Sequence, residues 1–436
     1  MKKILAGMLL LMPFFADAQP LPRRSFLGIQ MENITEDVKK LIGITENYGV
    51  LINGTVPGST AEAAGFKKGD ILLSINNEQI RNVQEAINIV AAQKRETEFT
   101  YELVRDRKKV KGKSTMKPYP SEKYAGIITE YSEVKTATGL QRVIITKPEG
   151  GAKLPVVVFI GGIGCYSLDM PFDSTSSEVQ LLNKIARAGF LVARVEKPGI
   201  GDGVGFSKKS SEISFMEEKD VYVQAIKDLK LRPDVSTENV HIIGHSMGGV
   251  MAPLVAMETA VKGIVAYGTI GSNFIEYLLK TRRTIGEAYN WSMDETDTYV
   301  KDACECASYY FINKMTTEEA AKKKAICGEY LSVFDLRSRK YNDELYALNL
   351  PALWKPFTGK ALLVWGKSDF ISALEDHEIL AETINKTHSG NATLALVNNA
   401  DHGMNYAADF STALNNPGKY NPEVGETILT WLKANS

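Results

Sequence analysis

The pattern of apolar and polar positions predicts a large C-terminal part built from alternating strands and helices. From about residue 125 onward, short apolar runs alternate with segments whose apolar residues recur at helical spacing. This alternation is typical of a mostly parallel sheet with helices on both faces. We predict strands at residues 141–145, 155–160, 191–195, 240–244, 263–267, 361–365 and 394–397, and helices at residues 179–188, 217–229, 249–259, 374–384 and 423–433.

The alternation stops between Gly271 and about Pro356, where aromatic and charged helical segments replace it. We predict that residues 272–356 form a helical cap, inserted before the strand that begins at Ala361. The cap is rich in aromatic residues, which either line a substrate pocket or pack the cap's own core. The residues concerned are Tyr289, Trp291, Tyr309, Tyr310, Phe311 and Trp354.

Residues 19–116 have a pattern of their own, which predicts a small α+β domain. A polar, basic stretch at residues 112–124 contains Pro118 and Pro120 and indicates a semi-rigid linker to the larger domain, residues 117–436. Within the small domain we predict strands at residues 26–29, 48–52 and 97–104 and a helix at residues 83–92.

The first residues have the pattern of a targeting segment. Lys2 and Lys3 precede an apolar run, and Ala16-Asp-Ala18 provides a small-x-small cleavage site before Gln19. The run is too short to span a bilayer as a helix, and no later apolar stretch in the sequence is long enough. We therefore expect a signal peptide over residues 1–18 and export to the periplasm or the extracellular space. An uncleaved N-terminal anchor is the alternative.

Charge and cysteine content narrow the classes of partner. The sequence contains 51 Lys and Arg against 52 Asp and Glu, so its net charge does not attract the protein to nucleic acid or to an anionic membrane. Among the four cysteines, Cys304 and Cys306 lie two apart in a helical stretch and point to different sides, so one of them is expected to pair with Cys327. We expect no metal site, since no histidine lies nearby to complete one.

A short apolar run of residues ends at a serine that has a glycine two residues away on each side. Gly244, Ser246 and Gly248 form a G-x-S-x-G elbow, in which small residues let the backbone turn tightly and lift the Ser246 hydroxyl above the sheet edge. An apolar strand precedes this serine and an apolar helix face follows it. The context favours a nucleophilic serine over an ordinary glycine-rich surface turn.

With this elbow, residues 117–436 resemble the α/β-hydrolase superfamily. The resemblance implies an α/β-hydrolase fold with a helical cap insertion and a triad in the order Ser, acid, His. His402 follows the last predicted strand and is the expected histidine. Asp369, after the strand that begins at Ala361, is the expected acid, and Asp376 and Asp401 are less well placed.

The resemblance also implies an oxyanion hole formed by two backbone N–H groups. One is expected from Met247, the residue after the nucleophile, and the second from Ile163 in the loop Gly161-Gly-Ile-Gly164. Gly161 stands where the superfamily usually has a histidine.

Residues 19–116 resemble a PDZ domain of the kind found in bacterial periplasmic proteases. The resemblance rests on the Ser25-Phe-Leu-Gly-Ile29 loop and on the Gly58-Ser-x-Ala-x-x-Ala-Gly65 and Gly69-Asp-Ile71 motifs. It implies a loop that binds the carboxylate of a protein C-terminus and a strand edge that a peptide can extend. The expected ligand residues are Phe26, Leu27, Gly28, Ile29, Val83, Ile87 and Val90, although the last three fit equally well as core residues.

Together these features predict an exported serine hydrolase that cleaves a carboxylic ester or related acyl compound through an acyl-enzyme, without a cofactor. A serine peptidase acting on peptides is the nearest alternative, because of the PDZ-like domain and the expected export. A catalytically idle hydrolase fold that only binds a partner is the alternative of another class.

Overall fold

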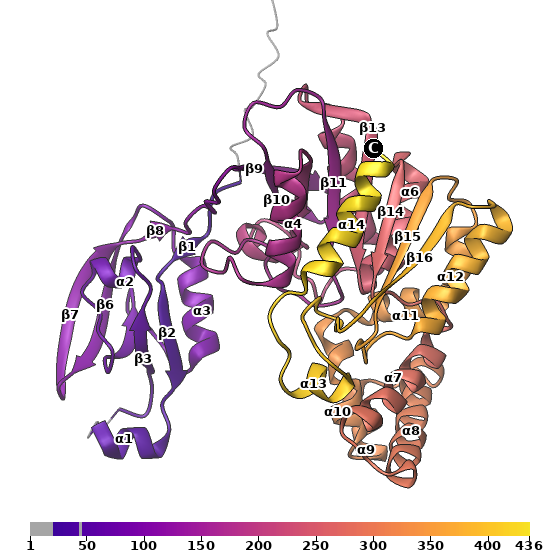
Figure 1. The fold of residues 1–436 in the computed structure, drawn as a ribbon. Coiled ribbons are helices and arrows are strands. Elements are labelled where there is room, and N and C mark those ends of the chain that lie inside the picture. The colour runs from indigo at the N-terminus through magenta and orange to yellow at the C-terminus, as the bar shows by residue number, and fades with distance from the viewer. Residues whose placement is uncertain (1–20, 43–45) are drawn as a thin grey trace, which may run out of the picture.

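The computed structural model describes residues 21–42 and 46–436 of the chain. The described elements form an N-terminal unit (residues 21–118) and a larger C-terminal unit (residues 119–436), which lie side by side (Figure 1). The expected signal peptide at residues 1–18 lies outside the described residues. Within the described parts of the chain, no helix is both long and apolar enough to cross a membrane.

The N-terminal unit is a sheet with a helix across it. The main strand order is β2-β3-β4-β6-β7, and the helix α3 (Val83–Ala92) has the predicted bounds. Its apolar core lies between the sheet and this helix. The strands are β2 (Ile29–Asn33), β3 (Val50–Thr55), β4 (Ile71–Ile75), β6 (Glu98–Arg105) and β7 (Lys108–Thr115); β1 (Ser25–Phe26) pairs with β8 (Lys117–Pro118), β5 (Glu78–Gln79) pairs with β4, and α1 (Glu36–Ile42) and α2 (Thr60–Ala63) are short helices.

Strand β7 corrects one prediction of the sequence analysis. Residues 112–115, which we assigned to the linker, are the second half of β7 and pair with β6. The strand lies at the end of the sheet, and its side chains alternate between exposed and half-buried positions. An edge strand of this kind carries mostly Lys, Ser and Thr, so its composition is that of a linker.

The C-terminal unit is an eight-stranded, mostly parallel sheet with the order β16-β15-β14-β13-β11-β12-β10-β9. The hairpin of β9 and β10 is antiparallel and lies at one edge of the sheet. The sequence analysis did not predict β9, because its residues are mostly half-buried and polar. The strands are β9 (Ile128–Thr136), β10 (Gly139–Lys147), β11 (Leu154–Ile160), β12 (Leu191–Val195), β13 (Val235–His245), β14 (Gly263–Tyr267), β15 (Lys360–Gly366) and β16 (Ala392–Val397).

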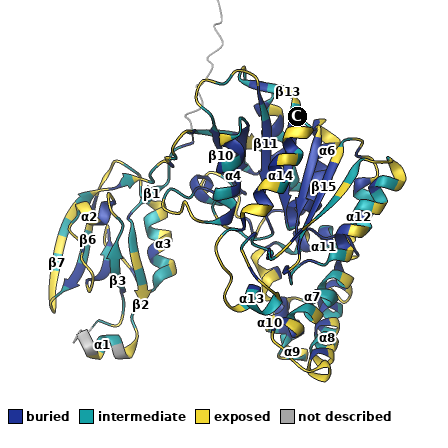
Figure 2. Cartoon of the chain, in the orientation of Figure 1, coloured by how far each residue is buried: buried dark blue, intermediate teal, exposed yellow. Residues whose placement is uncertain are grey.

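Two apolar cores cover the two faces of this sheet. Along β11, Val156 and Val158 face one core while Val157 and Phe159 face the other, as the alternation of side chains in a strand requires. Every residue of β12 and β14 is buried, and most of the central sheet is dark blue in Figure 2. Helices α5 (Phe215–Leu229), α6 (Met247–Thr259) and α12 (Leu374–Thr387) supply the first core, and α4 (Ser177–Arg187) and α14 (Pro422–Ala434) the second.

A helical insertion separates β14 from β15, at the position predicted for the cap. Tyr310, Phe311 and Trp354 are buried there in continuity with the core of the sheet, so these three pack the interior. Tyr289 and Trp291 stack on each other and stay partly exposed. The elements are α7 (Phe274–Ala288), α8 (Met293–Ala307), η2 (Ser308–Ile312), α9 (Thr317–Lys323), α10 (Cys327–Leu331), η3 (Ser332–Leu336), α11 (Arg339–Ala347) and η4 (Pro351–Trp354).

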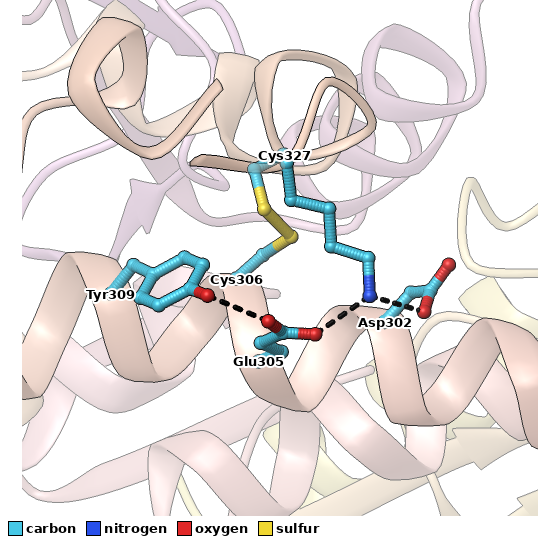
Figure 3. The surroundings of a disulfide bond; sticks show 6 residues. Asp302, Glu305, Cys306, Tyr309 and Cys327 are labelled. Atoms are coloured by element: carbon cyan, nitrogen blue, oxygen red, sulfur yellow. Dashed lines mark hydrogen bonds and ion pairs between the residues drawn. A yellow bond between two sulfur atoms is a disulfide. The ribbon is translucent and has the colours of Figure 1, made fainter. Parts of the chain in front are cut away.

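A disulfide closes part of the cap. Cys306 near the end of α8 is bonded to Cys327 at the start of α10, which resolves the choice that the sequence left open. Figure 3 shows the hydrogen bond that Tyr309 donates to Glu305 beside it. Lys324 forms ion pairs with Glu305 and Asp302. The bond therefore fixes the packing of α8 against α10.

We predict that replacing both bonded cysteines (Cys306→Ala with Cys327→Ala) lowers the free energy of unfolding by about 3 kcal/mol, because the closed loop restricts the unfolded chain. Urea unfolding under non-reducing conditions measures this change. The matched control is Cys304→Ala, at a free and exposed cysteine of the same helix, which is expected to leave the free energy unchanged. An equal loss in the control would contradict the assigned pairing.

Candidate active site

Ser246 occupies a strained position between β13 and α6. Its φ of 55° and ψ of −121° lie outside the regions that non-glycine residues favour, and such a conformation costs about 1–3 kcal/mol. Two backbone hydrogen bonds hold it: the N–H of Ser246 donates to the Tyr267 carbonyl, and the Ser246 carbonyl accepts from the Gly249 N–H, both at 2.9 Å. The elbow expected from the G-x-S-x-G motif is thus present in the backbone.

The flanking glycines permit a close approach of backbone to backbone. A Cβ on Gly244 would lie 2.4 Å from the Gly248 carbonyl oxygen, and a Cβ on Gly248 would lie 2.0 Å from the Ile160 carbonyl oxygen. Both distances are impossible for a real side chain. Any larger residue at either position would therefore push α6 away from the ends of β11 and β13.

Asp369 and His402 follow the neighbouring strands β15 and β16 and are hydrogen-bonded to each other. His402 Nδ1 lies 2.9 Å from Asp369 Oδ2. The buried carboxylate also accepts hydrogen bonds from the N–H groups of Ile371 and Ser372 and from the Ser372 hydroxyl. Burial opposes ionisation of Asp369, but His402 and Ser372 outweigh it and lower the pKa of this carboxyl below its ordinary value.

Gly268, the first residue after β14, lies against the acid–histidine pair. A Cβ on Gly268 would come within 3.0 Å of both Asp369 Oδ2 and His402 Nδ1. The preceding residue, Tyr267, accepts the hydrogen bond of the Ser246 N–H, and His245 Nε2 lies 2.8 Å from the His402 carbonyl oxygen. Asp369 and His402 thus lie against Gly268, one residue from the Tyr267 carbonyl that contacts Ser246, and the hydrogen bond between Ser246 and His402 stays a prediction. The sequence analysis did not single out Gly268.

The loop after β11 lies against the serine. A Cβ on Gly162 would be 3.2 Å from Ser246 Cβ and 3.6 Å from Ser246 Oγ. Lys197 Nζ donates to the carbonyl oxygens of Gly162 and, at 2.7 Å, of Gly164. In a trans peptide the N–H points opposite to the preceding carbonyl, so the Ile163 N–H points away from Lys197.

Arg337, from the cap, holds the next carbonyl of the same loop. Its Nε and Nη2 donate to the Ile163 carbonyl oxygen at 3.0 and 2.8 Å, and its Nη1 lies 2.6 Å from Glu218 Oε2. Lys197 is 3.8 Å from the other oxygen of Glu218. Burial, partly offset by Glu218, lowers the pKa of Lys197 to about 8. These three charged residues are distant in sequence, so no local motif identified them.

Comparison with known proteins supports the division of the chain into an N-terminal and a C-terminal unit. Residues 51–105 match the PDZ domain family model. Over 294 residues the chain is 24% identical to esterase EstD of Thermotoga maritima, covering 66% of this chain and 64% of that esterase. The chain has an α/β-hydrolase fold with an N-terminal PDZ domain.

Two further likenesses concern single parts of the molecule. Over 99 residues the chain is 29% identical to a probable periplasmic serine endoprotease, DegP-like, of Marinomonas sp., covering 23% of this chain and 21% of the relative. A solved hyperthermophilic esterase from the archaeon Pyrobaculum calidifontis matches at a TM-score of 0.44 and 17% identity, covering 70% of this chain and 83% of that one. The chain thus spans less than two thirds of either curated relative.

The predicted ligand residues of the PDZ domain do not all lie in one place. Val83 packs against the domain core and does not line the adjacent cavity. A cavity of about 1100 Å³ lies beside the loop and α3, and six of the seven predicted residues line it: Phe26, Leu27, Gly28, Ile29, Ile87 and Val90. Its opposite wall comes from the hydrolase part of the chain.

The remaining histidines make structural contacts, and no metal cluster accompanies them. His377 accepts a hydrogen bond from the Thr269 N–H, and His388 Nε2 contacts the Lys355 carbonyl oxygen. His241 is fully buried inside β13. Over residues 21–42 and 46–436, no group of three or more His, Cys, Asp or Glu side chains is placed to hold a metal ion.

Because the His241 imidazole is buried, we predict that the folded protein loses stability in acid. Burial, reinforced by the charge of Lys262, lowers the pKa of His241 to about 4. The unfolded chain protonates this imidazole near its ordinary pKa, so the folded state loses stability as the pH falls from about 6.5 toward 4 and is unaffected above that window. Between pH 7 and 4.5 the loss is about 2 kcal/mol.

Urea unfolding of the wild type and of His241→Gln at both pH values measures this contribution. The variant cannot titrate at this position, so its free energy of unfolding is expected to fall less between pH 7 and 4.5. An equal fall in both proteins would contradict the role of His241.

Proposed function

We propose that the protein is a serine hydrolase that cleaves a carboxylic ester, or a related acyl compound, through an acyl-enzyme. The observation that carries the proposal is the hydrogen-bonded Asp369–His402 pair beside the strained Ser246 elbow. The similarity to an esterase over 66% of the chain supports the same reaction class. The loop at Gly162 lies against Ser246 and is held by the buried Lys197, which supports a fixed place for the substrate carbonyl.

In the proposed mechanism Ser246 Oγ attacks the carbonyl carbon while His402 accepts the hydroxyl proton at Nε2. Asp369 keeps the proton of His402 on Nδ1 and stabilises the imidazolium that forms. The N–H groups of Met247 and Ile163 stabilise the negative oxygen of the tetrahedral intermediate. The intermediate collapses as His402 protonates the leaving alcohol, and water activated by His402 then hydrolyses the acyl-enzyme.

A serine peptidase is the second candidate, and the PDZ domain favours it. A peptide-binding domain beside a hydrolase suits a polypeptide substrate. The endoprotease relative covers only 23% of this chain, however, whereas the esterase relative covers 66%. Turnover of a panel of acyl esters and matched peptide amides discriminates the two, since an esterase cleaves the esters alone.

We further propose that the protein is exported. The targeting pattern of residues 1–18 supports export, and so does the Cys306–Cys327 disulfide, because such bonds persist in oxidising compartments. The PDZ relatives that are named periplasmic point to the same compartment.

The triad assignment predicts that Ser246→Ala and His402→Ala each lower kcat for a small ester by at least about 10⁴-fold. Both side chains act in one step, so the double variant is expected to be no worse than either single one. Ser236→Ala, at the opposite end of β13, is the matched control with unchanged turnover. Full activity in a folded Ser246→Ala protein would reject the nucleophile.

The hydrogen bonds from Arg337 to the Ile163 carbonyl predict that Arg337 positions the proposed oxyanion loop. Arg337→Lys keeps the charge beside Glu218 but loses the paired donation to the Ile163 carbonyl, so we expect kcat to fall about 10- to 100-fold with little change in KM. Arg339→Lys is the matched control, because Arg339 donates to the carbonyls of Tyr310 and Met315 within the cap. Equal falls in kcat for both variants would contradict the role.

A further inference from the structure

The hydrolase part presents exposed apolar side chains to the PDZ domain. Phe172, Val204 and Phe206 are 51%, 45% and 47% exposed, an unusual state for large apolar residues that lie close together. All three line the cavity of about 1100 Å³. On its other side lies Ile87 of α3, which is 47% exposed. The cavity thus has one apolar wall from each part of the chain.

Ion pairs fix the two walls relative to each other. Asp202, in the loop that carries Val204 and Phe206, is buried and accepts from Arg23 Nη1 at 2.7 Å and from the Arg24 N–H at 2.8 Å. Arg142 of β10 bonds the same carboxylate at 2.8 Å. Phe26 stacks on Phe172 with ring centroids 5.2 Å apart. The hydrolase wall is therefore held in place beside the PDZ loop.

The PDZ side of the cavity offers backbone groups to an extended peptide. Among the described strands β2 is at the end of its sheet and pairs only with β3, so its other edge is open. The carbonyls of Leu27 and Gly28 accept from the N–H groups of Ala61 and Val56 inside the domain. In a trans peptide the N–H points opposite to the preceding carbonyl, so the N–H groups of Gly28 and Ile29 point away from these two donors, which suits a carboxylate.

We propose that this cavity binds the extended C-terminal segment of a partner protein between its PDZ wall and its hydrolase wall, and that it selects apolar side chains at both the last and the penultimate position of that segment. Successive side chains of a strand point in opposite directions. When the last side chain packs against α3 near Ile87, the penultimate one therefore points to the hydrolase wall at Val204 and Phe206. A PDZ domain standing alone would leave that second side chain in water.

The ligand is a separate molecule. Residues 433–436 do not line the cavity, and Ser436 Oγ donates to the Leu432 carbonyl of α14, which keeps these residues on their own helix. The inference rests on the peptide-binding role of the PDZ domain and is independent of the chemistry at Ser246.

Fluorescence anisotropy with labelled seven-residue peptides and the full-length protein tests the proposal. The peptides differ only at their ends: Val-Val, Ser-Val, Val-Ser, and Val-Val with an amidated terminus. We expect Val-Val to bind about 10-fold more tightly than Ser-Val, the gain from burying one valine side chain. The amidated peptide and Val-Ser are expected to bind more weakly than Val-Val.

Variants assign each effect to one wall. The double variant Val204→Ser with Phe206→Ser is expected to remove the advantage of Val-Val over Ser-Val while leaving the affinity for Ser-Val unchanged. Ile87→Ser is expected to weaken both peptides. Leu231→Ser, at an 83% exposed residue that does not line the cavity, is the matched control and is expected to change neither affinity.

Equal affinities of Val-Val and Ser-Val for the wild type would overturn the two-sided site, even if both bind. Binding of none of the peptides would overturn the peptide-binding role as well. Ester turnover measured on the same preparations reports on Ser246 separately, so a failure of binding and a failure of the proposed catalysis remain distinguishable. Unchanged turnover and thermal unfolding also show that the surface variants are folded.

Discussion

The contact on which the site depends is the packing of backbone against backbone where α6 meets the end of β11. Only a glycine at position 248 fits there, because a Cβ would lie 2.0 Å from the Ile160 carbonyl oxygen. This approach brings the first turn of α6, with the Met247 N–H, next to the loop that contains Gly162. The same contact therefore sets the strained serine and the proposed oxyanion loop beside each other.

The loop after β11 connects three parts of the molecule. Gly162 lies against Ser246, the Ile163 carbonyl is held by Arg337 of the cap, and Asp169 pairs with Arg23 just before the PDZ loop. A single segment thus contacts the nucleophile, the cap and the connection to the PDZ domain. For this reason the cap and the PDZ domain both bear on the candidate site, although neither supplies a residue of the proposed triad.

The sequence predicted the central part of the fold well for a physical reason. Strands buried on both faces are continuous apolar runs, and β12 and β14 have the predicted bounds. Edge strands such as β7 and β9 face water on part of their surface, so their composition is that of a linker or a loop. The aromatic residues of the cap predicted a pocket equally well as a core, and only the structure shows that Phe311 and Trp354 are buried in the core.

The residues of the candidate site divide in the same way. Ser246, Asp369 and His402 each follow a recognisable strand, so local patterns were enough to propose them. Lys197, Arg337 and Gly268 act through contacts with residues far away in the sequence, and no local pattern marks them. The hydrolase wall of the PDZ cavity was missed for the same reason, since it exists only where the two parts of the chain meet.

We propose that Ser246 is an activated nucleophile. Covalent labelling of the full-length protein with a fluorophosphonate, followed by mass spectrometry of the digested chain, tests this directly. We predict one label per chain, on the peptide that contains Ser246, and none in the folded Ser246→Ala variant. Absence of label on the folded wild type, or label that persists in the variant, would contradict it.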